Sequence, residues 1–450
     1  MAQPSRLTRA LAFRDLVVYG LLFIGPLAPV GVFGVLDART DGAVALVYLM
    51  ATIAMAFTAW SYAQMSRVVP HAGSVFAYAS QGLGTSAGFL AGWLAMLDYL
   101  LIPAVAYLFS GIALHALLPS VPAWIFTLLA FTATTALNLA GVAVAARAGA
   151  IVLAAEIGVL LLFTALALVA LAGTGAARPW ASPLTGLGTF DLSAAVGAVS
   201  VAVLSFLGFD AIAGFAEENS GEARDVGRAI LVCLAIAGVT FVAQTWLAAL
   251  LAQVRPAELM AMPERQGTAF YDITRAAIAP WLATVLALTK AVGPAFAAMT
   301  GQAAAARLLF GMARDGKLPR ALAAVDARHG VPRTALASSA LLTLAVAIWA
   351  ARRPDGLEVL VSIVDVGALA AFTLLHMSVV GYFVIGGKAP ARAAHAVVPV
   401  LGAIVTAWVI VESRPLAQMV GALWAMAGLV VVEAQRRRWG SGFGVRGSGF

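Results

Sequence analysis

The sequence predicts an all-α membrane protein with about twelve transmembrane helices. The chain has 450 residues, of which 62% are hydrophobic and only 11% are charged; soluble domains carry about 25% charged residues. Long apolar runs recur along the chain, and a run of about 20 residues is enough to cross a bilayer. Two of these runs are interrupted near their centres, by Gly25 and Pro26 in the first and by Gly208 and Asp210 in the sixth.

The apolar runs set the positions of the predicted helices. Runs of this length are expected to be helical, because backbone polar groups in lipid must be satisfied within the segment. The predicted spans are residues 16–36, 44–65, 88–115, 122–141, 148–172, 193–216, 228–252, 280–310, 334–351, 357–385, 396–412 and 416–434.

Basic residues in the connecting loops predict the orientation. If the N-terminus is cytoplasmic, 19 of the 28 Lys and Arg residues fall on the inner side, 8 fall on the outer side, and Lys290 lies within a span. This asymmetry follows the positive-inside rule and predicts that both termini are cytoplasmic. We expect a multi-pass protein of the plasma membrane.

The spans also suggest how the chain is divided. Each of the blocks 16–172 and 193–385 holds five spans and opens with an interrupted one, which is typical of inverted repeats. Residues 1–15 are expected to be a cytoplasmic N-terminus, 396–434 two appended spans, and 435–450 a disordered cytoplasmic tail.

Three connecting segments are expected to carry some structure of their own. Residues 74–84 are amphipathic and predict a helix lying at the membrane interface. Residues 257–278 predict short helices outside the membrane. Residues 313–332 are basic and rich in Pro and Gly, which predicts a cytoplasmic loop.

Composition and motif searches favour a transporter over other classes of protein. The single cysteine, Cys233, excludes an intrachain disulfide, and the five histidines show no metal-ligand spacing. No nucleophile elbow or nucleotide-binding loop is found. We therefore expect no enzyme activity, cofactor or metal, and we do not interpret the net charge of +7 as nucleic-acid binding.

Asp210 is the first candidate functional residue. A charged residue at membrane depth costs at least about 2.5–3.5 kcal/mol, so it predicts a functional site. Asp210 has two candidate roles, pairing with a substrate ammonium and carrying a proton. The alternative is structural, with the carboxylate accepting hydrogen bonds from backbone N–H groups at the helix break.

Several segments resemble the amino acid–polyamine–organocation permease family. Residues 70–74 with 88–93 (PHAGS and GFLAGW) are similar to its helix 2–3 signature, and residues 208–211 with Glu217 and Glu218 resemble its helix 6 signature. Residues 306–319 (ARLLFGMARDGKLP) resemble the loop after helix 8. The resemblance implies the leucine-transporter fold and secondary active transport by alternating access.

Within that family, two segments are most similar to bacterial putrescine importers. These are residues 97–103 (LDYLLIP) and 367–373 (GALAAFT). Amino-acid-carrying members have a Gly-Ser-Gly type of break in helix 1, whose N–H groups hold the substrate carboxylate. Here Pro26 and Pro29 have no N–H to offer, so the sequence fits a diamine at least as well as an amino acid.

The expected substrate site lies between the two helix breaks. The candidate substrate-binding residues are Ile24, Gly25, Pro26, Leu27, Ala28, Asp98, Tyr99, Phe206, Gly208, Phe209, Asp210 and Phe296. Tyr99 can attract an alkylammonium through its ring. Each aromatic residue has packing as its alternative role, and Asp98 has an interhelical hydrogen bond.

Other intramembrane charges have weaker predicted roles. Asp210, Glu156 and Asp98 are the candidates for proton coupling. Glu156 is alternatively an amine ligand or a structural partner of Lys290, and we expect Lys290 and Asp365 to snorkel outward or to pair with each other. Sodium is less favoured than the proton, because helix 8 offers only the separated hydroxyls of Thr289 and Thr300.

A further hypothesis concerns the inner end of the sixth span. Glu217 and Glu218 are either solvated or part of a cytoplasmic gate of salt bridges to Arg6, Arg14 or Arg67.

Taken together, the sequence predicts a proton-coupled importer of putrescine, another polyamine or an amino acid. The alternatives are an amino acid permease or exchanger and, more remotely, a non-transporting sensor or a membrane-embedded enzyme. Nothing in the sequence predicts the oligomeric state.

Overall fold

The computed structural model describes residues 9–71, 73–118, 120–188, 191–326, 331–353, 356–413 and 415–440. Within these ranges the chain is almost entirely helical, and the only strand-like pairing is an isolated bridge between Leu11 and Asn219. Twelve helical segments of the described chain are long and apolar enough to cross a membrane. The predicted all-α fold with twelve spans is confirmed.

The spans are formed by long helices that agree with the predicted runs to within a few residues at most ends. They are α1 (Phe13–Ile24) with η1 (Ala28–Gly31), α3 (Val44–Val68), α5 (Thr85–Leu117), α6 (Ala123–Ala140), α7 (Val142–Thr174), α9 (Leu192–Leu204) with η2 (Phe209–Phe215), α10 (Ala223–Leu251), α14 (Pro280–Arg314), α15 (Arg333–Ala351), α16 (Gly356–Val379) with η4 (Val380–Ile385), α17 (Ala394–Glu412) and α18 (Pro415–Gly440).

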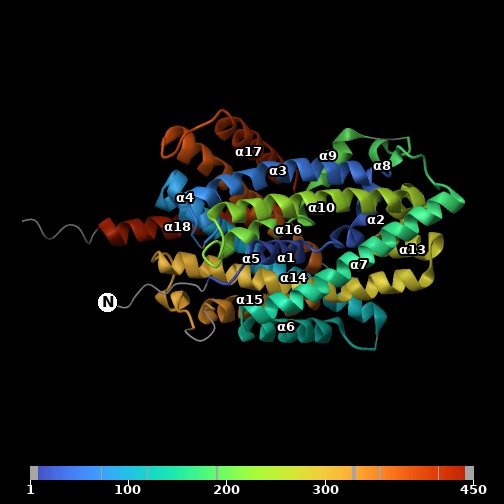
Figure 1. Cartoon of the computed structure of the whole chain (residues 1–450), viewed down its shortest axis with the longest axis horizontal. Coiled ribbons are helices and arrows are strands. Elements are labelled where there is room, and N and C mark those ends of the chain that lie inside the picture. Colours follow the sequence, from blue (N-terminus) through green and yellow to red (C-terminus); the bar gives the residue numbers. More distant parts are fainter. Residues whose placement is uncertain are drawn as a thin grey trace, which may run out of the picture.

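Short helices connect the spans at the two ends of the bundle. They are α2 (Phe33–Arg39), α4 (Val75–Leu83), α8 (Ser182–Thr185), α11 (Pro256–Ala261), α12 (Pro263–Gln266), α13 (Ala269–Ala277) and η3 (Arg320–Ala323). Figure 1 shows α4 at the end of the bundle where the N-terminus lies, and α2, α8 and α13 at the other end. We call these ends the N-terminal face and the opposite face.

The core of the bundle forms around α1, α5, α10 and α14. α5 packs against α14 and α16, and α10 packs against α3 and α1. By contrast, α7 and α17 expose large apolar side chains, including Ile151, Val169 and Val411. Such surfaces are unusual on soluble proteins, and they suit contact with lipid chains.

Two connecting segments differ from their predictions. A helix does form at α4, but the side chains of residues 75–79 are all buried against α5 and α16, so this half of the helix has no exposed face. The disordered tail was predicted to begin at residue 435, which is too early, because α18 continues to Gly440. The last ten residues of the tail lie outside the described part of the chain.

The first span is broken where the sequence predicted. α1 ends at Ile24, and the chain resumes a helical course only at η1, because Gly25 adopts a φ of 75° and Pro26 has no N–H to donate. The side chain of Gln244 on α10 donates to the Pro26 carbonyl at 3.0 Å. One carbonyl exposed by the break is thus satisfied from a neighbouring helix.

The sixth span is broken at the matching depth. α9 ends at Leu204, and η2 follows after Gly208, whose φ of 117° is a conformation that favours glycine. The ring of Phe23 on α1 lies directly against Gly208, so that a Cβ there would be 2.7 Å from Phe23 Cγ. The two breaks therefore touch each other inside the bundle.

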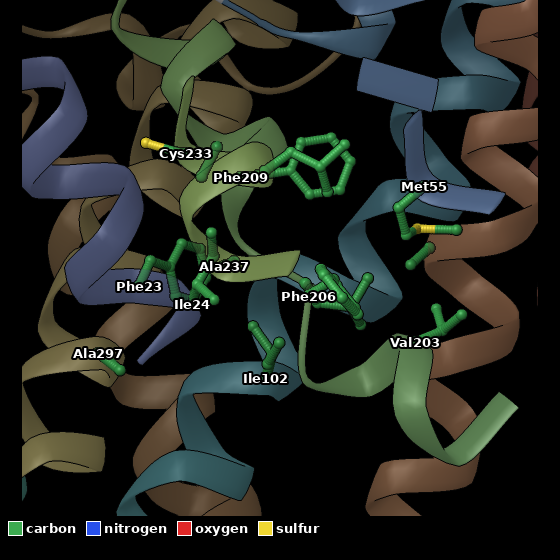
Figure 2. Close-up of a cluster of buried hydrophobic side chains, with 14 of the residues drawn as sticks. Phe23, Ile24, Met55, Ile102, Val203, Phe206, Phe209, Cys233, Ala237 and Ala297 are labelled. Carbon is green, nitrogen blue, oxygen red and sulfur yellow. The ribbon is translucent and has the colours of Figure 1, made fainter. Parts of the chain in front are cut away.

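The single cysteine packs α10 against α1. Cys233 is fully buried, and its thiol lies 3.4 Å from the Val17 carbonyl, which accepts its hydrogen bond. Figure 2 shows it in the same cluster of buried side chains as Phe23 and Phe209.

We predict that Gly208→Ala destabilises the protein. The added methyl group meets Phe23 at less than contact distance, and overpacking costs about 1–3 kcal/mol; the left-handed backbone adds about 1–2 kcal/mol. The measurement is the thermal unfolding midpoint of the detergent-purified protein. Gly158→Ala is the matched control, because nothing lies within 4 Å of a Cβ at that position on α7. Equal midpoints for the two variants would contradict the close approach.

Candidate functional site

Asp210 lies at the centre of a buried hydrogen-bond network beside the second break. Its Oδ2 accepts hydrogen bonds from Tyr99 at 2.6 Å and from Tyr62 at 3.4 Å. Its Oδ1 accepts from the backbone N–H of Gly208 at 3.3 Å, and Ser74 Oγ lies 3.3 Å from the Tyr99 hydroxyl. The network joins α3, α5 and η2, and it combines the two predicted candidates Asp210 and Tyr99.

This network satisfies part of what Asp210 needs as a carboxylate, but it provides no cation. No ion pair of Asp210 occurs among the described residues, while its side chain is almost completely buried. A charge buried without a partner is costly. The hydrogen bond to Gly208 is the structural role proposed as the alternative for Asp210, and the two tyrosine hydroxyls orient the same carboxylate.

Asp98 and Asp365 form a second acidic pair where α5 crosses α16. Each has an Oδ1 atom that is buried without a hydrogen-bond partner. The crossing is close, since a Cβ at Gly367 would lie 3.3 Å from the backbone nitrogen of Asp98. Charges on Asp210 and Asp365 both act on Asp98, so three carboxyl groups share this region.

The predicted pairing of Asp365 with Lys290 is wrong. Asp365 is buried on α16 next to α5, and no ion pair joins it to Lys290 in the described part of the chain. Its burial also excludes the predicted snorkelling to the outer surface. Asp365 is instead a neighbour of Asp98 that the sequence did not reveal.

A cavity of about 90 Å³ lies beside the first helix break. Residues from α1, α5, α7 and α14 line it, among them Ile24, Gly25, Ala28, Ile102, Glu156 and Lys290. Three of the predicted substrate-binding residues, Ile24, Gly25 and Ala28, thus face a cavity, together with the proton-coupling candidate Glu156. The other predicted residues are not among the described lining residues; they are Pro26, Leu27, Asp98, Tyr99, Phe206, Gly208, Phe209, Asp210 and Phe296.

Phe23 separates this cavity from the Asp210 network. Its ring lines the cavity and lies against Gly208 on one side and against Gly301 of α14 on the other. Figure 2 shows Phe23 and Ile24 on α1 close to Ala297 and Ile102, with Phe206 and Phe209 on the neighbouring broken span. Sequence reasoning missed Phe23, although its position directly before the break was a signal.

Phe206 and Phe209 lie among other aromatic rings. Phe206 is buried between Tyr48 and Phe241, with ring centroids 6.3 and 5.0 Å away. Phe209 lies between Tyr62 and Phe372, at 6.3 and 6.1 Å. Their rings surround the second break and the tyrosine that binds Asp210.

Ion pairs hold the N-terminal face closed, but with different partners from those predicted. Arg307 on α14 makes a bidentate pair with Glu218, in which both side chains are buried, and stacks over Phe215 at 4.1 Å. Arg314 makes a second bidentate pair with Glu217, at 2.6 and 2.8 Å.

Of the predicted gate partners, Arg14 contacts Asp15, and Arg6 lies outside the described residues. No pair joins Arg67 to either glutamate in the described part of the chain. Both arginines come from the helix that forms the eighth span, whereas the prediction named residues of the N-terminal segment and of the end of the second span.

A third buried ion pair lies at the opposite face. Arg178 donates to both carboxylate oxygens of Asp37 on α2, at 2.7 and 2.9 Å, and to the carbonyls of Ala252 and Val254. Burial raises the pKa of the Asp37 carboxyl, and the hydrogen bonds and charge of Arg178 oppose that rise. No feature of the sequence predicted this pair.

Comparisons with known proteins agree with this architecture. The profile of the amino acid permease family matches residues 16–432. The chain is 28% identical to the low-affinity putrescine importer PlaP of Escherichia coli (strain K12), over 94% of this chain and 93% of that one. It is 27% identical to the branched-chain amino acid permease BcaP of Bacillus subtilis (strain 168), over 83% and 81% of the two chains, and 26% identical to the methylthioribose transporter of the same organism, over 97% and 95%. With a family match across nearly all of its spans, the chain belongs to the amino acid permease family.

Proposed function

We propose that the protein is a secondary active transporter that imports a small amine-bearing solute across the plasma membrane of a bacterium. The solute is putrescine, another polyamine or an amino acid, and its uptake is driven by protons. The observation that carries this proposal is the contact between the two broken spans, with a cavity on one side of Phe23 and the carboxylate of Asp210 on the other.

Broken helices at mid-membrane are the usual site of substrate binding in secondary transporters. An interrupted helix leaves backbone N–H and C=O groups without partners inside the helix, and these groups can bind polar solutes and ions. In this chain the breaks follow Ile24 and Leu204. The substrate would bind where they meet and would be exposed alternately to the two sides.

The names of the relatives support an amine or amino acid as the solute. One relative is named a putrescine importer, and another is named a branched-chain amino acid permease. Both kinds of solute carry an ammonium group. The buried carboxyl groups of Asp210, Asp98 and Glu156 are suited to bind one.

The same carboxyl groups support proton coupling. A carboxylate buried in a membrane protein without a counter-ion is costly, and either a proton or a cationic substrate removes that cost. Protonation of one of the carboxyl groups of Asp210, Asp98 and Glu156, while another binds the ammonium, would couple the inward movement of proton and solute. Sodium is less favoured than the proton, because the hydroxyls of Thr289 and Thr300, the candidate side-chain ligands on α14, lie eleven residues apart in the sequence.

The division of the chain into repeats is part of the same proposal. Residues 16–172 and 193–385 would form two inverted five-span repeats, 396–434 would add two spans, and both termini would lie in the cytoplasm. In this arrangement α1 begins and α18 ends on the side of the bundle where the Arg307–Glu218 and Arg314–Glu217 pairs lie.

We predict that Asp210→Asn reduces uptake at least tenfold without lowering the amount of protein in the membrane. The amide keeps the shape of the side chain but can neither carry the negative charge nor exchange a proton. The measurement is uptake of labelled putrescine and of labelled amino acids into proteoliposomes. Glu258→Gln, an exposed carboxyl on α11, is the control and should transport normally. Normal uptake by Asp210→Asn would remove this residue from the mechanism.

We also predict that accumulation of the solute stops when the pH gradient is collapsed. In proteoliposomes with an imposed gradient, a protonophore should reduce accumulation to the equilibrium level, whereas replacing sodium by potassium should have no effect. Accumulation that followed the sodium gradient would instead overturn proton coupling and leave the transport function in place.

A further inference from the structure

Lys290 is a membrane-embedded cation that lacks a partner. It lies ten residues after Pro280 on α14, about 15 Å along the helix. It lines the cavity beside the first helix break, and no hydrogen bond or ion pair of Lys290 occurs among the described residues. Arg307, a buried cation further along α14, is by contrast fully paired. A charge at this depth without a partner indicates a binding function.

Glu156 faces Lys290 from α7 and also lacks a hydrogen-bond partner for one of its oxygens. Its Oε2 is buried and unpartnered, and its carboxyl group lies directly against Gly293 of α14, one turn from Lys290. The charges of the two residues act on each other, yet no contact of 4.0 Å or less joins them among the described ion pairs. The predicted structural pairing of Glu156 with Lys290 is thus incomplete.

The two charges share one cavity whose other walls are apolar. On α14, residues 290, 293, 294 and 297 line it, which is the spacing of a single helix face. Side chains such as Phe23, Ile102 and Leu207 complete the walls. The cavity therefore presents a positive group, a negative group and an apolar surface together.

The helix break has few backbone N–H groups that could bind an anion, and a side-chain cation can take their place. Pro26 and Pro29 remove two N–H groups that would otherwise be available to an anion. The Lys290 side chain reaches this segment, because its Cε would lie 3.7 Å from a Cβ at Gly31. An ammonium group placed beside the break can replace the missing backbone donors.

We propose that Lys290 and Glu156 form a binding site for an amino acid in its zwitterionic form, with an apolar side chain. Lys290 binds the carboxylate, Glu156 binds the ammonium, and the apolar walls hold the side chain. A diamine has no group for Lys290 and would place a positive charge close to it, so the site discriminates against putrescine. This proposal rests on the proposed transport function and names its substrate class.

The first test uses the unmodified protein and four ligands that differ in charge. Binding of leucine, 3-methylbutylamine, 4-methylpentanoate and putrescine is measured by calorimetry on the full-length protein in detergent. The first three share the same apolar group, and the second and third each lack one charge. We expect leucine to bind at least tenfold more tightly than each of the other three ligands. Tighter binding of putrescine, or binding of none of the four, would overturn the proposal.

The second test assigns the two charges to the two residues. Lys290→Met should abolish the advantage of leucine over 3-methylbutylamine, and Lys290→Arg should largely preserve it. Glu156→Gln should weaken binding of both ligands at least tenfold. Lys388→Met and Glu258→Gln make the same changes at exposed positions outside the cavity, and they should leave the affinities unchanged.

The outcomes separate this proposal from the proposed function. If the protein transports putrescine, and Lys290→Met leaves the ligand preference unaltered, the assignment of Lys290 is wrong while the transporter function stands. If proteoliposomes take up neither amines nor amino acids, the proposed function itself fails. Retention of the leucine preference by Lys290→Met would also contradict the assignment, whichever solute is transported.

Discussion

The bidentate ion pair between Arg307 and Glu218 connects the two broken spans to α14. The backbone carbonyl of Glu218 accepts hydrogen bonds from Ala10 and Leu11, at 3.0 and 2.9 Å, so the start of the first broken span is fixed to the end of the second. Arg307 then fixes both to α14. Because removing one member of a buried pair costs about 3–5 kcal/mol, the N-terminal face stays closed while this pair is intact. Opening toward that face requires the two spans to leave α14 together or the pair to separate.

The first broken span is held at both of its ends and is free in the middle. On the opposite face, Arg178 fixes α2 through Asp37 and through two backbone carbonyls. The break after Ile24 lies between these two ion pairs. There the side chain of Gln244 donates a hydrogen bond to the Pro26 carbonyl. The cavity and Phe23 lie beside this central break.

Hydropathy predicted the spans and the breaks, because both are local properties of the chain. The length of an apolar run, the glycine and proline residues at 25 and 26, and a carboxylate within a span can all be read in order along the sequence. The contacts of Asp365 could not be read in this way, since they depend on where α16 crosses α5. The surroundings of Lys290 could not be read in this way either, because the residues that share its cavity come from the first, third, fifth, sixth and eighth spans. For the same reason, the partner of Glu218 was predicted among Arg6, Arg14 and Arg67 and is instead Arg307 on α14.

The buried thiol of Cys233 can report on the separation of α1 from α10. This residue is the only thiol of the chain, and it is shielded by α1, to whose Val17 carbonyl it is hydrogen-bonded. Any motion that separates α1 from α10 uncovers the sulfur, whereas motion elsewhere in the bundle leaves it shielded. The rate at which a small alkylating reagent modifies the unaltered protein therefore measures how often α1 detaches, with no engineered label and no cysteine to remove.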